Sequence, residues 1–386
     1  MPAHPQLDPD LPACNDTAIY QETLRLDSRR AENYDVAMNS VVPAQDADRL
    51  TLRIVSPLRS VIRRLRTTKI SVPVVEKVLR GTLLAPLYGL FLIPLLARFR
   101  SRRSIVVSGR TNFGAEISCQ LPDLIQTYIW MFDEWEPDLT RFIANRLREG
   151  DVFVDVGANI GYYSLLAAQC VGPAGRVVAV EASPPVFADL QRHIDRNGVG
   201  DRVRAEHKAA AAETGTLSIF SGPVHNVGAS TTLGKHGAES VESIVEAQPL
   251  WNLLGEDEVG SIRLIKIDVE GAEPDVVTGM IGLIPRLPAD AEVILELSPK
   301  WWSDSGLRPM DVLRPFTDAG FCIYEMRNNY SAWRYLWPND VTDATRVRRD
   351  LTERVTRLDL VLSRVDDDRL PIDSRDFLAR FPTPPA

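Results

Sequence analysis

The sequence predicts an α/β fold in which a mostly parallel sheet is covered by helices on both faces. Three stretches, Val152–Val156, Val177–Val180 and Ile262–Asp268, are short, apolar and rich in β-branched residues. Such runs are typical of central parallel strands that are buried on both faces. Segments with helical spacing of apolar residues lie between them, as in open sheets wound in both directions.

The first of these strands leads into a glycine turn. Asp155 interrupts the apolar run near its carboxyl end, and Gly157, Asn159 and Gly161 follow with the spacing G-x-x-x-G. A carboxylate at this place lies at the crevice where open α/β sheets bind ligands. The turn lacks both G-x-G-x-x-G and the P-loop pattern, so a pyrophosphate or nucleoside triphosphate site is disfavoured.

The second strand also ends in an acid, Glu181. Its distance from Asp155 along the chain is close to the roughly 20 residues expected for a carboxylate that accepts hydrogen bonds from ribose hydroxyls. Such a carboxylate suits an adenosine without a 2′-phosphate. A run of small residues, Ala209–Ala212, offers space for an adenine ring beside it.

Three motifs resemble those of the FkbM family of S-adenosylmethionine-dependent methyltransferases. They are Val-Asp-Val-Gly-Ala-Asn-Ile-Gly-Tyr-Tyr-Ser (154–164), Val-Glu-Ala-Ser-Pro (180–184) and Leu-Ile-Lys-Ile-Asp-Val-Glu-Gly-Ala-Glu (264–273). Weaker matches are Trp135-Glu136-Pro137, Asn226–Ser230 and Leu295–Pro299. The resemblance covers about residues 104–364, and the third motif is its most specific part.

This resemblance implies a Rossmann-like class I methyltransferase fold with a seven-stranded, mostly parallel sheet. It implies S-adenosylmethionine as cofactor, with Asp155, Gly157, Asn159 and Gly161 around its methionine portion and Glu181 on its ribose. The usual family reaction is O-methylation of a sugar or another hydroxyl-bearing small molecule. The family comparison also places a substrate-side acid near Glu136, although Glu136-Pro137 equally reads as a helix start.

Charged residues gather at the end of the Ile262–Asp268 strand. Lys266 and Asp268 are two apart and therefore share a face, and burying either ion without a partner costs several kcal/mol. Glu270 follows in the next turn. We expect Asp268 to be the general base, with Glu270 and His225 of the polar 221–236 loop as alternatives. A structural ion-pair cluster and a divalent-metal site are the competing interpretations, and no metal ligand is assigned.

Composition limits the partners of the protein. The chain has 386 residues and a formal net charge of −8, which argues against general nucleic-acid binding. Its four cysteines show no C-x-x-C spacing, which favours a reducing compartment without a disulfide or metal framework. No basic start precedes an apolar core in the first thirty residues, so we expect a cytoplasmic protein.

The chain is expected to divide into four parts. They are a disordered or loosely packed segment (1–52), a basic and apolar helical segment (53–103), a methyltransferase domain that opens with a hairpin (104–365), and a C-terminal tail (366–386). The stretch from Ser56 to Arg103 contains eleven basic residues and only one acidic residue, Glu76. This segment also contains the uncharged run 81–97, interrupted by Pro86 and Pro94.

That uncharged run permits three interpretations. As a straight helix it would extend about 26 Å, just short of the roughly 30 Å hydrocarbon core, and its prolines are expected to shorten the unbroken portions. It could span a membrane, attach peripherally to one, or form a helical pair packed on the domain.

The function expected from all of this is O-methylation of a small-molecule, sugar or lipid-linked glycan acceptor, with possible peripheral membrane contact through 53–103. Two alternatives stay open at this point. One is a membrane-associated scaffold that keeps a non-catalytic cofactor fold. The other is a nicotinamide-dependent enzyme on a related scaffold, which the missing glycine pattern disfavours.

Overall fold

The structure is a computed structural model, and it describes residues 46–66, 73–101, 103–220, 241–302, 305–328, 330–336, 341–349, 351 and 356–381. Residues 44–386 belong to one compact unit. Most of the segment expected to be disordered, and the 221–236 loop with His225, lie outside the described residues.

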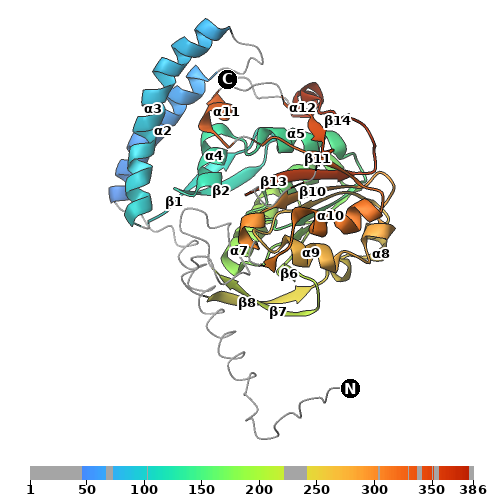
Figure 1. Cartoon of the computed structure of the whole chain (residues 1–386). Helices are drawn as coiled ribbons and strands as arrows, with labels where there is room; N and C mark the ends of the chain where they lie inside the picture. The colour runs from blue at the N-terminus through green and yellow to red at the C-terminus, as the bar shows by residue number, and fades with distance from the viewer. Residues whose placement is uncertain are drawn as a thin grey trace, which may run out of the picture. The chain divides into compact units, whose positions relative to one another are not determined.

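A nine-stranded sheet forms the centre of this unit (Figure 1), with the strand order β14-β12-β11-β13-β10-β9-β3-β4-β5. Strands β5, β4, β3, β9 and β10 are parallel, and β13 runs antiparallel between β10 and β11. The strands are β3 (Val152–Val156), β4 (Arg176–Val180), β5 (Val203–Glu206), β9 (Ile262–Ile267), β10 (Glu292–Leu297), β11 (Cys322–Glu325), β12 (Ala344–Arg346), β13 (Leu358–Ser363) and β14 (Arg369–Leu370).

Helices cover both faces of the sheet, as the sequence predicts. Side chains alternate between the faces along β3, so Phe153 joins one hydrophobic core and Val152, Val154 and Val156 join the other. The first core includes residues of α4 (Leu124–Phe132), α5 (Pro137–Arg146), α6 (Tyr162–Val171) and α7 (Pro184–Asn197). The second includes residues of α8 (Glu256–Val259), α9 (Glu273–Gly279) and α10 (Pro309–Asp318).

Two smaller sheets flank the main one. The predicted hairpin is confirmed as β1 (Ile105–Arg110) paired antiparallel with β2 (Glu116–Leu121). The strands β6 (Ala209–Ala210), β8 (Val241–Gln248) and β7 (Gly215–Phe220) make a three-stranded sheet in that order. The backbone of β6 places Ala209 and Ala210 at the edge of the main crevice.

The sequence-based strand count was too small by two. The seven strands implied by the family resemblance are present, and β12 and β14 extend the sheet beyond β11. The expectation of a C-terminal tail from residue 366 was also wrong, because this stretch contains β14 and α12 (Ser374–Arg380). Its apolar residues Leu370 and Phe377 are buried in the core, and their burial offsets the cost of ordering a charged, proline-rich stretch.

Two antiparallel helices precede the main sheet (Figure 1), and their bounds differ from those expected. Helix α2 (Asp46–Leu65) begins before Arg53, and α3 (Val74–Ser101) runs through Pro86 and Pro94 without a break. Each proline removes one backbone donor, but packing on one side of α3, at Leu84 and Phe91, holds the helix together.

Ion pairs and ring contacts attach this helix pair to α4. Arg59 and Arg63 of α2 both contact Asp133, which follows α4, and Phe91 of α3 stacks on Trp130 at a centroid distance of 6.2 Å. The helical-pair interpretation therefore describes how this segment folds. Among the described residues, the stretch Val78–Arg100 is the single helix long and apolar enough to cross a membrane.

Candidate functional site

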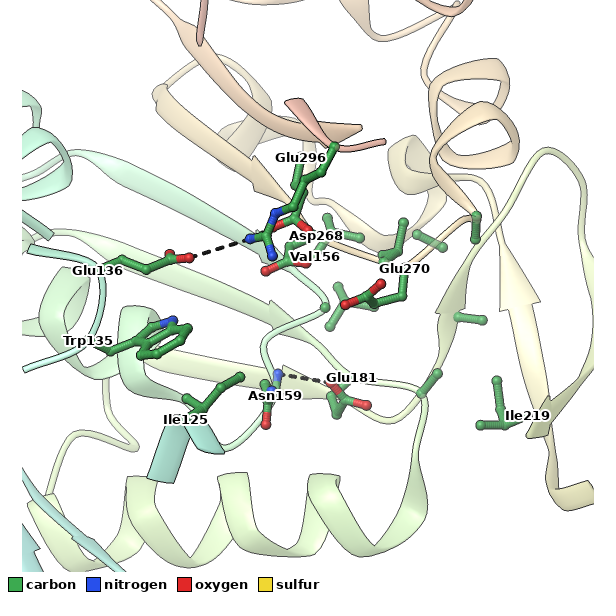
Figure 2. Close-up of a pocket in the computed structure, with 18 of the residues that line it drawn as sticks. Ile125, Trp135, Glu136, Val156, Asn159, Glu181, Ile219, Asp268, Glu270 and Glu296 are labelled. Carbon is green, nitrogen blue, oxygen red and sulfur yellow. Dashed lines mark hydrogen bonds and ion pairs between the residues drawn. The ribbon is translucent and has the colours of Figure 1, made fainter. Parts of the chain in front are cut away.

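A cavity of about 360 Å³ opens where the parallel strands β3, β4, β9 and β10 end. Figure 2 shows Asn159 and Glu181 on one side of it, and Asp268, Glu270 and Glu296 together on another. This edge is where open α/β sheets bind their ligands. The lining residues are Leu124, Ile125, Trp135, Glu136, Val156, Gly157, Asn159, Val180, Glu181, Ala182, Lys208, Ala209, Ala210, Ile219, Asp268, Val269, Glu270, Ala272, Glu296, Tyr330 and Arg357.

The glycine turn after β3 forms the floor of the cavity. Gly157 has φ +76°, and a Cβ added there would lie 1.9 Å from the carbonyl oxygen of Asp268. The turn and the end of β9 therefore approach so closely that only glycine fits. The backbone N–H groups of Gly157 and Ala158 both donate to the carbonyl of Val180, which fixes the turn against β4.

Glu181 is held beside this turn by backbone donors. Its Oε2 accepts from the N–H of Asn159 at 2.9 Å, and its Oε1 accepts from the N–H of Ser183 at 2.8 Å. Asn159 itself has φ +52°, and its Oδ1 accepts from the N–H of Ile160. The carboxylate is thus oriented by the backbone before any ligand arrives.

Two of the residues expected at the cofactor do not line the cavity. Asp155 is buried in β3, where its Oδ2 accepts from the Ser164 hydroxyl at 2.6 Å and burial raises its pKa. Gly161 is the N-cap of α6 with φ +89°, and a Cβ there would come within 2.6 Å of Leu190. Both therefore support the turn from behind it, while Gly157, Asn159 and Glu181 line the cavity.

Lys266 and Asp268 form the expected pair at the end of β9. Lys266 lies opposite Asp155 in the β3–β9 register, which confirms that the two strands are neighbours. The Lys266 Nζ donates to Asp268 Oδ2 at 2.9 Å and lies 5.0 Å from the centre of the Tyr163 ring. Burial opposes ionisation of both groups, but their mutual attraction outweighs it, so the pKa of Lys266 is raised and that of Asp268 is lowered.

Glu270 lies on the turn that follows Asp268 and also lines the cavity. Its backbone has φ +38°, which is uncommon for a residue with a side chain. Its Oε2 accepts from the indole N–H of Trp301 at 3.2 Å. Burial, and then the neighbouring Asp268, raise the pKa of Glu270. The carboxyls of Asp268 and Glu270 therefore differ in their readiness to hold a proton.

The structure adds Arg357, which the sequence-based site missed, and gathers several acids around it. Arg357, at the start of the β13 segment, has its Nη2 at 2.5 Å from Glu296, 3.6 Å from Glu136 and 3.6 Å from Asp359. The same guanidinium stacks on the Tyr330 ring at 4.3 Å. Four segments far apart in the chain thus meet at one end of the cavity.

Burial makes these acids hold protons more strongly than usual. Burial raises the pKa of Glu136 to about 7, with a further contribution from Asp359, although the Tyr163 and Tyr330 hydroxyls oppose this rise. Burial also raises the pKa of Glu296. An acid within the apolar run Leu295-Glu296-Leu297 was the signal that sequence reasoning could have used. Glu136, where the family comparison expects a substrate-side acid, lines the cavity and is also the N-cap of α5.

The competing interpretation of the acids as a metal site has no support in the part of the chain that is described. There, no group of three or more His, Cys, Asp or Glu side chains is arranged to hold a metal ion. The described cysteines, Cys119, Cys170 and Cys322, are free thiols.

The fold and this crevice define an S-adenosylmethionine-dependent methyltransferase. Residues 155–323 match the model of the methyltransferase FkbM domain. The third motif, from Leu264 to Glu273, lies within the matched range.

Three curated relatives are about a quarter to a third identical to this chain over the aligned residues. Methyltransferase sdnD of Sordaria araneosa is 28% identical, covering 49% of this chain and 80% of its own. The hexuronic acid methyltransferase AglP of Haloferax volcanii is 26% identical over 48% of this chain and 69% of its own. The 31-O-demethyl-FK506 methyltransferase FkbM of Streptomyces tacrolimicus is 32% identical over 35% of this chain and 61% of its own.

Solved structures align less closely. A SAM-dependent O-methyltransferase from Thermotoga maritima aligns with 73% of this chain and 82% of its own at 15% identity and a TM-score of 0.34. A putative methyltransferase from Streptococcus mutans, in complex with SAH, aligns with 61% of this chain and 99% of its own at 8% identity and a TM-score of 0.33. The strand order of this chain, rather than these alignments, defines its fold.

Proposed function

We propose that this enzyme methylates a hydroxyl group of a sugar, glycolipid or other small-molecule metabolite. The observation that carries the proposal is the pairing, in one cavity, of a preoriented carboxylate at Glu181 with the acids Asp268 and Glu270. The first suits the ribose of the cofactor, and the others suit an acceptor hydroxyl.

The residues around the turn fit S-adenosylmethionine. The close approach at Gly157 leaves backbone in place of a side chain at the cavity floor, and the Glu181 carboxylate lines the cavity as a hydrogen-bond acceptor suited to ribose hydroxyls. Ala209 and Ala210 also line the cavity, and their small side chains leave room for an adenine ring. We assign Gly157, Asn159 and Glu181 to direct cofactor contacts, and Asp155 and Gly161 to support of the turn.

When bound, the cofactor would supply a methyl group attached to a sulfonium; this methyl group would pass to the acceptor oxygen as its bond to sulfur breaks. The protein has to align that oxygen and take its proton. We assign Asp268 to this role, with Lys266 orienting it through the 2.9 Å hydrogen bond. Glu270 and His225 are the alternative bases, and His225 lies outside the described residues.

The acceptor end of the cavity supports a hydroxyl-rich substrate. Its lining includes the carboxyls of Glu136, Asp268, Glu270 and Glu296, and one guanidinium, that of Arg357. Carboxylates accept hydrogen bonds from hydroxyl groups, so a polyol or sugar can satisfy several of them at once. The names of two relatives point the same way, since one acts on a hexuronic acid and another on a 31-O-demethyl compound.

We place the enzyme in the cytoplasm, with peripheral membrane contact through residues 53–103. A lipid-linked glycan would then be within the range of acceptors. The long apolar helix Val78–Arg100 supports this part of the proposal.

A coupled assay for S-adenosylhomocysteine release tests the proposed reaction. The full chain is incubated with S-adenosylmethionine and pools of cell metabolites, polar lipids and lipid-linked glycans. Pools that give activity are then fractionated until the methyl acceptor is isolated. Mass spectrometry of the product should place the new methyl group on oxygen. Calorimetry with S-adenosylhomocysteine and with NAD separates a non-catalytic cofactor-binding protein and a nicotinamide enzyme from the proposed activity.

A further inference from the structure

Helix α3 has two faces of different character. The buried face carries Leu84, Phe91 and Leu95, which pack against α2 and α4. The opposite face carries a stripe that we define as Val75, Leu79, Leu83, Leu90, Ile93 and Leu96. At 100° per residue these six stay within an arc of about 140° and extend over about 32 Å of helix.

The stripe is exposed to solvent in the protein alone. Its six side chains are between 52% and 80% exposed. A surface helix of a soluble protein normally turns charged residues outward, whereas no residue from Gly81 to Ala97 is charged. A continuous apolar surface of this length indicates an interaction site.

Exposed arginines gather at one end of the helix pair. Because Arg98 of α3 pairs with Asp48 of α2 at 2.5 Å, the start of α2 lies beside the end of α3. Four exposed arginines lie at this end, Arg49, Arg53, Arg100 and Arg103. Within the described ranges none of them has a carboxylate partner. Arg100 falls in the same arc of α3 as the stripe.

These charges select among the possible occupants of the stripe. A second copy of the chain would bring no acid to Arg100 from its own α3, because the described acid of that helix, Glu76, is already paired with Arg80. Lipid phosphates provide negative charge next to an apolar layer, which matches both parts of the surface.

Contacts on the other face oppose a membrane-spanning arrangement. A spanning α3 would have to give up the Arg98–Asp48 pair and the stacking of Phe91 on Trp130. It would also expose Leu84 and Leu95, which are now buried. A helix lying in the membrane plane keeps all of these contacts and buries only the stripe.

We propose that α3 lies in the plane of an anionic membrane surface, with the stripe at the headgroup–acyl boundary and the arginines at its end bound to lipid phosphates. The inference develops the membrane contact of the proposed function and is independent of the methyl acceptor.

The test is co-sedimentation of the full chain with phosphatidylcholine vesicles, with and without phosphatidylglycerol. We expect binding mainly to the anionic vesicles and partial release by salt, because screening weakens the arginine contacts. Replacing Leu83, Leu90 and Ile93 together with Gln should lower the vesicle partition coefficient at least about tenfold, since three apolar side chains no longer leave water. Arg53→Gln with Arg100→Gln should remove most of the preference for phosphatidylglycerol.

A matched control replaces three exposed apolar residues elsewhere, Trp251, Ile281 and Leu378, with Gln. It should bind vesicles like the parent. Calorimetry with S-adenosylhomocysteine checks that every variant is folded, so loss of vesicle binding is distinguishable from loss of the proposed cofactor site.

Three outcomes would overturn the proposal. Failure of the parent to sediment with either vesicle rejects a membrane surface. Retention in the pellet after an alkaline carbonate wash indicates a spanning helix. A parent dimer that the stripe variant converts to a monomer, without vesicle binding, assigns the stripe to a second copy.

Discussion

The two ends of the cavity are built in different ways. The end that we assign to the cofactor comes mostly from one continuous stretch, in which the backbone of the Gly157 turn and of Asn159 sets the position of Glu181. At the end that we assign to the acceptor, Arg357 joins Glu136 and Glu296 from separate segments through ion pairs, and Asp268 is paired with Lys266. The first end is held by local backbone geometry and the second by tertiary packing.

This difference has a functional consequence. A backbone-built site accepts one ligand class, because its N–H groups and its close approaches cannot be exchanged without changing the turn. A site built from side chains can change with single substitutions while the sheet stays intact. We therefore expect the acceptor end to set substrate choice within a common cofactor chemistry.

The largest expected effect is at Gly157. A methyl group there would meet the Asp268 carbonyl at 1.9 Å, so Gly157→Ala must displace β9 or the turn. We expect a loss of more than about 4 kcal/mol in the free energy of unfolding, together with loss of S-adenosylhomocysteine binding. Urea unfolding and calorimetry measure the two quantities.

Gly114→Ala is the matched control for backbone conformation alone. Gly114 has φ +92° but nothing within 4 Å of an added Cβ. The Gly114→Ala substitution should lower the free energy of unfolding by only about 1–3 kcal/mol and leave cofactor binding unchanged. Equal losses in the two variants would mean that the close approach at Gly157 is unimportant.

The same contrast explains what the sequence could predict. The strand–turn–strand pattern around Asp155 and Glu181, and the neighbouring strand with Lys266 and Asp268, depend on local periodicity and on short motifs. These features were predicted correctly as elements. The cofactor-side residues could therefore be nominated from these motifs and the family resemblance that they carry, although Asp155 and Gly161 do not line the cavity.

Only part of the acceptor end could be nominated from the sequence: Asp268 and Glu270 at a strand end, and Glu136 from the family resemblance. Arg357 follows a stretch that has no motif, and its importance comes from meeting Glu136 and Glu296 across large distances in the sequence. Two other predictions were wrong for a related reason. The tail was expected to be unstructured, yet Phe377 is buried, and α3 was expected to be interrupted at its two prolines, yet it is continuous. In each case tertiary packing overrode the local composition.

The second prediction concerns the proposed base. Asp268→Asn keeps the shape of the side chain but removes the acceptor for a proton, so turnover should fall by about 10²–10⁴-fold. Cofactor affinity should stay nearly unchanged, because Glu181 is on the other side of the cavity. Initial rates of S-adenosylhomocysteine release and calorimetry test both statements.

Asp275→Asn, on the exposed side of α9, is the control and should have the parent rate. If Asp268→Asn retains turnover within a few-fold of the parent, Asp268 is not the base. Activity that then falls as the pH drops through about 6.5 would assign the role to His225.

The third prediction concerns Glu181. Glu181→Gln keeps an oxygen acceptor but replaces the second oxygen and the charge, so either Asn159 or Ser183 loses its acceptor. Affinity for S-adenosylhomocysteine should weaken by about 1.5–3 kcal/mol, which is roughly tenfold to a hundredfold. Glu213→Gln, at an exposed acid, should bind like the parent. An unchanged dissociation constant for Glu181→Gln would show that the ribose lies elsewhere.

The smallest expected effect tests the side-chain-built end through its pH dependence. The pKa of Glu136 is raised from 4.5 to about 7, chiefly by burial. Between these values the folded protein holds a proton that the unfolded chain releases, so this residue contributes stability that falls as the pH rises through the window. Glu136→Gln carries no titrating proton and lacks this dependence.

We therefore expect Glu136→Gln to gain stability relative to the parent between pH 5 and pH 8, by about 2 kcal/mol. Urea midpoints at several pH values measure the difference, and exposed Glu213→Gln supplies the baseline for loss of one surface carboxylate. The glutamine can still accept from Tyr163, and Arg357 keeps its contact with Glu296, so the ion-pair network is only partly reduced. Parallel stability curves for parent and variant would show that Glu136 is ionised in the folded protein across this range, and the acceptor end would then carry more negative charge than burial alone permits.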